Sequence, residues 1–188
     1  MTARGQGDWE LLERRGVESE LDADEILRLL IGAGVDFVVI GGFAVIAHGY
    51  LRATKDIDIV PRPTADNRDA LERALASINA QPIEQADLRP DEMPVQWGTG
   101  ALAHGGNWAL QTDHGRIDVL QHIDRVDVVE TYSELRDQAL EADVPAVGVV
   151  RFASLEHLEL MKRVAGRPQD INDLAQLEEI RAEPRFPA

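Results

Sequence analysis

The sequence contains no cysteine, only two lysines and no long apolar run. Without cysteine the chain can form neither disulfides nor thiolate zinc sites, and it has no cysteine nucleophile. No segment approaches the roughly 20 consecutive apolar residues that a membrane-spanning helix needs, and the amino-terminal residues lack the apolar stretch of a secretory signal. These absences favour a protein of the reducing cytoplasm that has no membrane partner.

Charge and apolar content narrow the choice further. Hydrophobic residues make up 44% of the 188 residues, which is enough for an ordinary buried core. The formal net charge is −15 at pH 7, and such a surface repels a nucleic-acid backbone. The two lysines, Lys55 and Lys162, stand against 17 arginines, and both lie in segments that carry candidate functional residues.

Periodicity and turn signals predict an α/β (α+β) fold in which a small mixed sheet is flanked by helices and followed by a helical C-terminal portion. We expect strands at residues 37–40, 57–60, 108–111, 116–121 and 147–150. Helices are expected at residues 22–33, 43–48, 64–80, 131–142, 154–165 and 170–181, with a long loop at 81–94. Four side chains are predicted to cap helices: Asp22, Thr64, Ser154 and Asp170. The expected organisation is a polar tail at 1–20, a core at 21–150 and a C-terminal helical segment at 151–188.

Carboxylates occupy alternate positions in one predicted strand. Asp56 and Asp58 share a face, because successive side chains of a strand point to opposite sides, and same-face neighbours lie roughly 6.6 Å apart. Asp118 lies between apolar neighbours in a later predicted strand. If the two strands are adjacent, three carboxylates cluster and repel one another unless a cation lies between them. Oxygen ligands of this kind suit Mg²⁺ or Mn²⁺.

A chance origin has to be weighed for this pair, because 18 of the 188 residues are aspartate. A second Asp-x-Asp, Asp22-Ala23-Asp24, is best interpreted as a helix cap. Acids flanked on both sides by isoleucine or valine in two separate strands have no comparable explanation as solvent-exposed residues.

Two glycines precede these acids. Gly41 and Gly42 follow a short apolar strand and open a helix, an arrangement in which backbone N–H groups can approach a phosphate. A plain tight turn is the alternative. Between the glycines and the acids, Arg52 and Lys55 can bind a triphosphate or can pair with a nearby acid.

The stretch from residue 36 to residue 60, DFVVIGGFAVIAHGYLRATKDIDIV, resembles the nucleotidyltransferase (polymerase β-like) superfamily. That pattern is a strand, Gly-Gly or Gly-Ser, a short helix, Asp-x-Asp on the next strand and a later third acid. The Arg52-x-Thr54-x-Asp-x-Asp version resembles bacterial toxin-type enzymes related to AbiEii and MenT. Residues 162–174 resemble their C-terminal element with a lysine and an Arg-Pro-x-Asp sequence. Gly42 replaces a serine of many relatives.

The resemblance implies a metal-dependent transfer of a nucleoside monophosphate from a nucleoside triphosphate (NTP) to an acceptor, on a nucleotidyltransferase sheet. It assigns catalytic roles to Asp56, Asp58, Asp118 and Lys162, of which the three aspartates hold Mg²⁺ or Mn²⁺. It assigns nucleotide binding to Gly41, Gly42, Arg52, Thr54, Lys55, Arg167 and Asp170.

The acceptor is left open at this point. By resemblance it is an RNA, notably a tRNA end, with the protein acting as a toxin neutralised by a cognate antitoxin protein. The acidic balance argues mildly against RNA. The alternatives are a protein hydroxyl, a small molecule such as an aminoglycoside, or a non-catalytic nucleotide-binding or antitoxin-like module.

Overall fold

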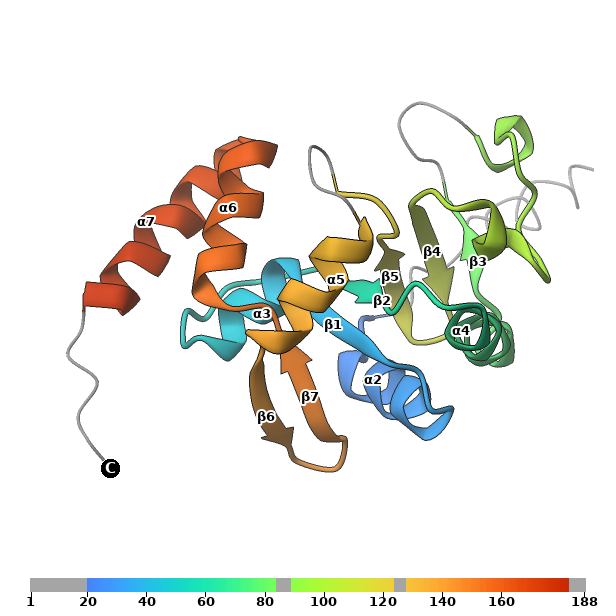
Figure 1. The fold of residues 1–188 in the computed structure, drawn as a ribbon, viewed down its shortest axis with the longest axis horizontal. Coiled ribbons are helices and arrows are strands. Elements are labelled where there is room, and N and C mark those ends of the chain that lie inside the picture. The colour runs from blue at the N-terminus through green and yellow to red at the C-terminus, as the bar shows by residue number, and fades with distance from the viewer. Residues whose placement is uncertain (1–19, 84–88, 124–127, 183–188) are drawn as a thin grey trace, which may run out of the picture.

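A computed structural model describes residues 20–83, 89–123 and 128–182 of the chain (Figure 1). Its centre is a seven-stranded mixed sheet with the strand order β3-β4-β5-β2-β1-β7-β6. The strands are β1 (Phe37–Ile40), β2 (Asp56–Pro61), β3 (Gln81–Pro82), β4 (Trp108–Thr112), β5 (Gly115–Val119), β6 (Leu140–Val144) and β7 (Gly148–Phe152). The α-helices are α2 (Ala23–Gly32), α3 (Gly41–Ala47), α4 (Ala65–Ser77), α5 (Val128–Asp137), α6 (Leu155–Ala165) and α7 (Pro168–Ala182). Short 3₁₀ turns are η1 (Pro90–Glu92) and η2 (Ala101–His104).

The mixed sheet confirms the predicted α/β (α+β) class. β2 lies at the middle of the order, antiparallel to β1 and parallel to β5. Hairpins extend both sides, with β4 antiparallel to β5 and β6 antiparallel to β7. The expected polar tail at 1–20 falls almost entirely outside the described residues. Within those residues, every helix is too short or too polar to cross a lipid bilayer.

The core follows the predicted apolar periodicity. All four residues of β1 are buried, and Ile57 and Ile59 of β2 are fully buried. Leu71 and Leu75 of α4 are also fully buried. Burial of these side chains leaves the remaining face of β2 to its aspartates, as the strand period of two requires.

Two of the predicted helix caps are confirmed, Thr64 occupies the predicted N-cap position without a capping hydrogen bond, and the Asp170 cap is wrong. The Asp22 carboxylate accepts a hydrogen bond from the Glu25 amide at 3.0 Å, and Ser154 Oγ accepts one from the His157 amide at 3.3 Å. Thr64 precedes α4, but its side chain makes no capping hydrogen bond. Its hydroxyl is turned instead toward Arg62, whose Nε donates to it at 3.2 Å.

Asp170 is not the N-cap of its helix. Helix α7 begins at Pro168, which is two residues earlier than predicted and a favourable first position for proline. Asp170 therefore lies inside the first turn. Its carboxylate still serves the helix start, because it accepts a hydrogen bond from the backbone amide of Arg167 at 3.1 Å.

The start of α3 also differs from the prediction. The glycine pair was expected to separate β1 from a helix at 43–48, but α3 begins at Gly41 itself and ends at Ala47. Gly41 has a φ of +63°, a conformation that glycine adopts without the steric cost that other residues meet. The chain thus turns directly from strand to helix.

Strand β6 replaces the end of a predicted helix. The helix expected at 131–142 ends at Asp137, and residues Leu140–Val144 pair with β7 in the register Leu140↔Phe152 to Val144↔Gly148. Leucine, glutamate and alanine in this segment favour a helix locally. The hairpin partner, which lies later in the chain, overrides that propensity.

Helices α6 and α7 lie side by side at one end of the molecule, away from α4 and the β3–β4 edge (Figure 1). β7 ends at Phe152, two residues beyond the expected boundary of the C-terminal segment. Gly166, with a φ of +61°, ends α6, and the division into a core and a C-terminal segment stays a prediction.

Candidate active site

The three predicted carboxylates lie together on one face of the sheet. Asp58 and Asp118 are direct partners in the parallel β2–β5 register, and Asp56 is two residues before Asp58 on β2. Each alternates with a buried isoleucine or valine that faces the core. The adjacency of β2 and β5 was the condition for the cluster, and the structure confirms it.

Burial and mutual repulsion make two of these carboxylates hard to ionise. Burial raises the pKa of Asp58 to about 7, and the negative charges of Asp56 and Asp118 add to the effect. Burial likewise raises the pKa of Asp118 to about 6, with a further contribution from Asp56. Arg167 opposes both increases. A bound cation would remove the remaining repulsion.

The donor set fits a divalent cation. Oδ1 of Asp118 is buried and makes no hydrogen bond within the described part of the chain, and a buried carboxylate oxygen without a partner is costly. Carboxylate oxygens are the ligands that Mg²⁺ and Mn²⁺ prefer. As the side chains stand, no three histidine, aspartate or glutamate residues of segments 20–83, 89–123 and 128–182 converge as a finished metal site. The three aspartates are therefore fitting ligands that a cation would draw together.

The glycine pair lies tightly against this cluster. A Cβ on Gly41 would lie 1.9 Å from Oδ2 of Asp58, and one on Gly42 would lie 2.7 Å from Oγ1 of Thr54. Gly42 therefore has no room for the serine that many relatives carry unless Thr54 shifts. The predicted contact of Gly41 and Gly42 with phosphate stays a prediction.

Thr54 is placed to orient an acid. Its hydroxyl donates to the backbone oxygen of Asp56 at 3.1 Å and lies 3.4 Å from the Asp56 carboxylate. Lys55, the next residue, is exposed and lines neither of the cavities described below. The predicted nucleotide contacts of both residues stay predictions.

A buried ion network joins Lys162 to the loop before β2. Lys162 is 6% exposed, and its Nζ donates to Asp173 at 2.6 Å and to Asp170 at 3.3 Å. Asp173 also accepts a hydrogen bond from Arg52 at 2.5 Å. With its amide oxygen turned toward Arg52, Gln169 accepts a second one at 2.7 Å. Lys162 and Arg52 are thus held side by side through a single carboxylate.

Asp173 and Gln169 were not among the predicted site residues. Asp173 is 2% exposed and pairs with two cationic side chains, Arg52 and Lys162. The available signal was its position one helical turn after Asp170, on the same face of α7.

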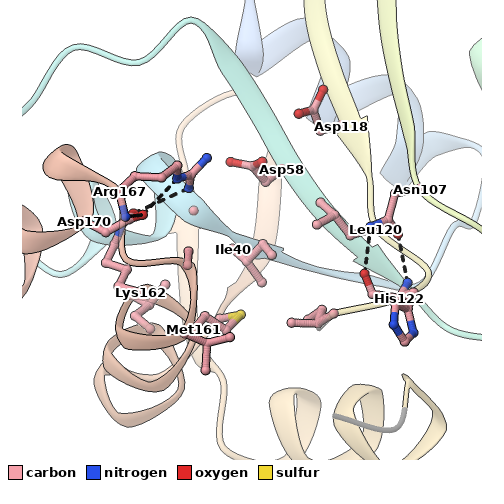
Figure 2. Close-up of a pocket in the computed structure, with 15 residues that line it drawn as sticks. Ile40, Asp58, Asn107, Asp118, Leu120, His122, Met161, Lys162, Arg167 and Asp170 are labelled. Atoms are coloured by element: carbon pink, nitrogen blue, oxygen red, sulfur yellow. Dashed lines mark hydrogen bonds and ion pairs between the residues drawn. The ribbon is translucent and has the colours of Figure 1, made fainter. Parts of the chain in front are cut away.

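Arg167 reaches from the start of α7 toward the aspartates (Figure 2). Its Nε donates to Asp170 at 2.8 Å, while three quarters of its side chain is exposed. The first cause of its raised pKa is this hydrogen bond, and the charges of Asp170, Asp58 and Asp56 also contribute. Arg167 remains charged and accessible to an anionic ligand.

Two cavities meet at these residues. The first, which we name the polar cavity, has a volume of about 390 Å³ and is lined by four aspartates, three cations and the glycine pair: Asp56, Asp58, Asp118, Asp170, Arg52, Lys162, Arg167, Gly41 and Gly42, with Pro168 and Gln169. The second, the apolar cavity, has a volume of about 290 Å³. It shares six lining residues with the first, among them Asp58, Asp118, Lys162 and Arg167, and is otherwise lined mainly by aliphatic side chains of β1, of α6 and of the segment after β5 (Figure 2).

Comparison with known proteins found a matching family model and solved structures of similar fold. A family model described as "Nucleotidyltransferase of unknown function (DUF6036)" matches residues 18–182. The lincosamide antibiotic adenylyltransferase LnuA, in its lincomycin-bound crystal structure, is similar over 86% of this chain and 99% of its own, with a TM-score of 0.56 and 18% identity. A candidate nucleotidyltransferase from Thermotoga maritima is similar over 82% and 89%, with a TM-score of 0.50 and 15% identity. At these identities the two structures show a shared fold. No curated protein sequence matches the chain significantly.

Proposed function

This chain belongs to the nucleotidyltransferase family of unknown function DUF6036, and on that premise we propose that it transfers a nucleoside monophosphate from an NTP to a hydroxyl group. The observation that carries the proposal is the pairing of Asp58 with Asp118 across β2 and β5, beside Asp56 and at the mouth of the polar cavity. The more specific AbiEii- and MenT-type relationship rests on sequence resemblance alone.

The polar cavity suits a triphosphate bound with cations. Its wall carries four carboxylates against three cationic side chains, so the protein alone does not neutralise an additional polyanion. Asp56, Asp58 and Asp118 would hold Mg²⁺ or Mn²⁺. Such a metal supplies Lewis acidity at the α-phosphate and neutralises charge on the leaving group.

The chain's own residues account for binding and orientation. Arg52, Lys162 and Arg167 draw the β- and γ-phosphates into the polar cavity. The bond between the acceptor oxygen and the α-phosphorus forms as the α–β bridging P–O bond breaks, and pyrophosphate leaves with that electron pair. The hydroxyl proton passes to the Asp118 carboxylate and on to solvent.

The principal test is label transfer from α-labelled NTPs to cell-extract fractions in the presence of Mg²⁺. We expect wild-type protein to label an acceptor with one or more of the four NTPs, and we expect Asp56→Asn and Asp58→Asn to lower transfer by at least about a hundredfold. Asp24→Asn is the matched control, because Asp24 belongs to the other Asp-x-Asp and is exposed on α2. Absence of label in every fraction with every NTP refutes the proposal.

The sequence leaves several acceptors open. A tRNA end, a role as a toxin and a cognate antitoxin stay predictions of the resemblance. Lincomycin in the LnuA structure supports a small-molecule acceptor for a related fold, and the geometry of the second cavity bears on the choice.

A further inference from the structure

Resting on the proposed transfer, we propose that the apolar cavity binds the acceptor and that this acceptor is a small, largely apolar molecule with a hydroxyl group. The starting observation is that the two cavities share one carboxylate pair and differ in the residues around it. Asp58 and Asp118 line both cavities. β2 and β5 are parallel here. Residues before and after the Asp58–Asp118 pair therefore lie toward opposite ends of both strands, and they indicate which cavity lies at which end.

Each cavity also has residues that line it alone. Asp56, which precedes Asp58 on β2, lines only the polar cavity, together with Arg52 and Gln169. Leu120, which follows Asp118, lines only the apolar cavity. The Leu120 amide bonds the Ile59 oxygen at 2.9 Å, which continues the β2–β5 alignment past the carboxylate pair. The polar cavity thus lies toward the start of the parallel strands and the apolar cavity toward their end.

The geometry of phosphoryl transfer indicates which cavity holds the acceptor. In an in-line displacement, the attacking oxygen and the leaving group lie on opposite sides of the phosphorus. Arg52 is the cation that lines only the polar cavity, so an α-phosphorus at the Asp58–Asp118 pair with its pyrophosphate drawn toward Arg52 faces the apolar cavity on the side of attack. The attacking hydroxyl is therefore presented from the apolar cavity.

The lining of the apolar cavity indicates the chemistry of the acceptor. Nine residues line this cavity and not the polar cavity. Two are polar, Asn107 and His122, and seven are apolar: Ile40, Leu120, Ile123, Leu158, Met161, Val164 and Ala165. Figure 2 shows Ile40 between Asp58 and Met161 in this view. Burial of apolar ligand surface against such a wall is the main source of affinity available there.

Asn107 shapes the polar corner of this cavity. Its amide nitrogen donates to the His122 carbonyl at 2.8 Å, and its amide oxygen accepts from the backbone amides of Gln121 and His122 at 3.0 and 2.9 Å. These three bonds hold the segment after β5 against the start of β4. This corner of the cavity wall is therefore held by hydrogen bonds within the chain.

Size and charge argue against a macromolecular acceptor. A volume of about 290 Å³ lies at the small end of pockets for small molecules. Among the described residues that line the apolar cavity, the only lysine or arginine side chains are Lys162 and Arg167, which also line the polar cavity. A nucleic acid needs several further cationic contacts to its phosphates, whereas a small amphipathic alcohol does not.

The experiment combines label transfer with variants that fill the cavity. Met161→Trp and Val164→Trp insert a large side chain into its α6 wall, and Leu160→Trp is the matched control because Leu160 is 48% exposed and lines neither cavity. The probes are the four α-labelled NTPs with Mg²⁺, incubated with separated small-molecule, RNA and protein fractions of a cell extract. NTP affinity is measured by calorimetry with a non-hydrolysable analogue, which also reports whether each variant keeps a folded site.

We expect label in the small-molecule fraction, on a product retained by a reversed-phase column. Transfer falls at least about tenfold in both cavity variants, while NTP affinity changes less than about twofold and Leu160→Trp matches wild type. Label only in RNA or only in protein overturns the inference and leaves nucleotidyl transfer standing. A fall in NTP affinity in both cavity variants assigns the apolar cavity to the nucleoside and also overturns it. Absence of label everywhere refutes the proposed function itself.

Discussion

At Asp58, burial and neighbouring negative charge both disfavour ionisation. The folded-state pKa of about 7 lies above the ordinary value of 3.8, so the folded protein binds a proton at Asp58 more tightly than the unfolded chain does. Its contribution to stability is fully present below the unfolded pKa and is lost as the pH rises through about 7. We predict that metal-free wild-type protein loses stability between about pH 5 and pH 8.

The variant Asp58→Asn tests this assignment. At about pH 8 without metal it should be more stable than wild type by on the order of 2 kcal/mol, because it removes a buried charge from beside two others. Urea unfolding at about pH 5 and about pH 8 measures the difference in stability between the variant and wild type. Asp24→Asn is the exposed control. Equal stability of Asp58→Asn and wild type at pH 8 contradicts the predicted burial of charge.

Gly41 is constrained by contact as well as by conformation. Alanine there meets both a φ of +63° and the Asp58 carboxylate, whereas Gly49 has a φ of +106° with nothing within 4 Å of an added Cβ. We predict that Gly41→Ala loses at least about 1 kcal/mol more stability than Gly49→Ala and that only Gly41→Ala loses label transfer. Similar losses in the two variants, measured by urea unfolding, argue against the close packing of Gly41 on Asp58.

At the scale of elements, α6 and α7 are joined to the loop before β2 through Asp173. Asp173→Ala leaves the buried Lys162 and the partly buried Arg52 without their shared carboxylate. We predict a loss of about 3 kcal/mol, together with a raised KM for NTP because both cations lose their orientation. Glu25→Ala, which removes the exposed pair with Arg28, should cost less than about 1 kcal/mol. Equal costs in thermal or urea unfolding would show that Asp173 does not hold these elements together.

At the scale of the whole molecule, the net charge of −15 opposes association with polyanions. We predict no measurable binding of total tRNA at about 0.15 M salt, because the acidic surface repels phosphates at close approach even with a screening length of about 8 Å, and the described site offers few cations for phosphate contacts. Fluorescence anisotropy with labelled tRNA over a salt series checks this. Tight binding that weakens steeply with salt would favour the tRNA acceptor predicted by resemblance and would count against the small-molecule acceptor.

Periodic local patterns in the sequence determined the class of fold and the shared face of Asp56 and Asp58 on β2. Alternation of aspartate with isoleucine predicts which face of β2 carries Asp56 and Asp58, since a strand has only two faces. The Asp22 and Ser154 caps are equally local, because each bonds an amide three residues away. These features need no knowledge of distant partners.

Only the tertiary structure decided the features that depend on distant partners. β6 is a strand because β7 pairs with it, although its residues favour a helix. Asp173 holds Arg52 from 121 residues away, and the apolar cavity combines strand ends with one face of α6. The physical reason is that periodicity records which side of an element is buried, whereas contacts between elements depend on the topology that brings them together.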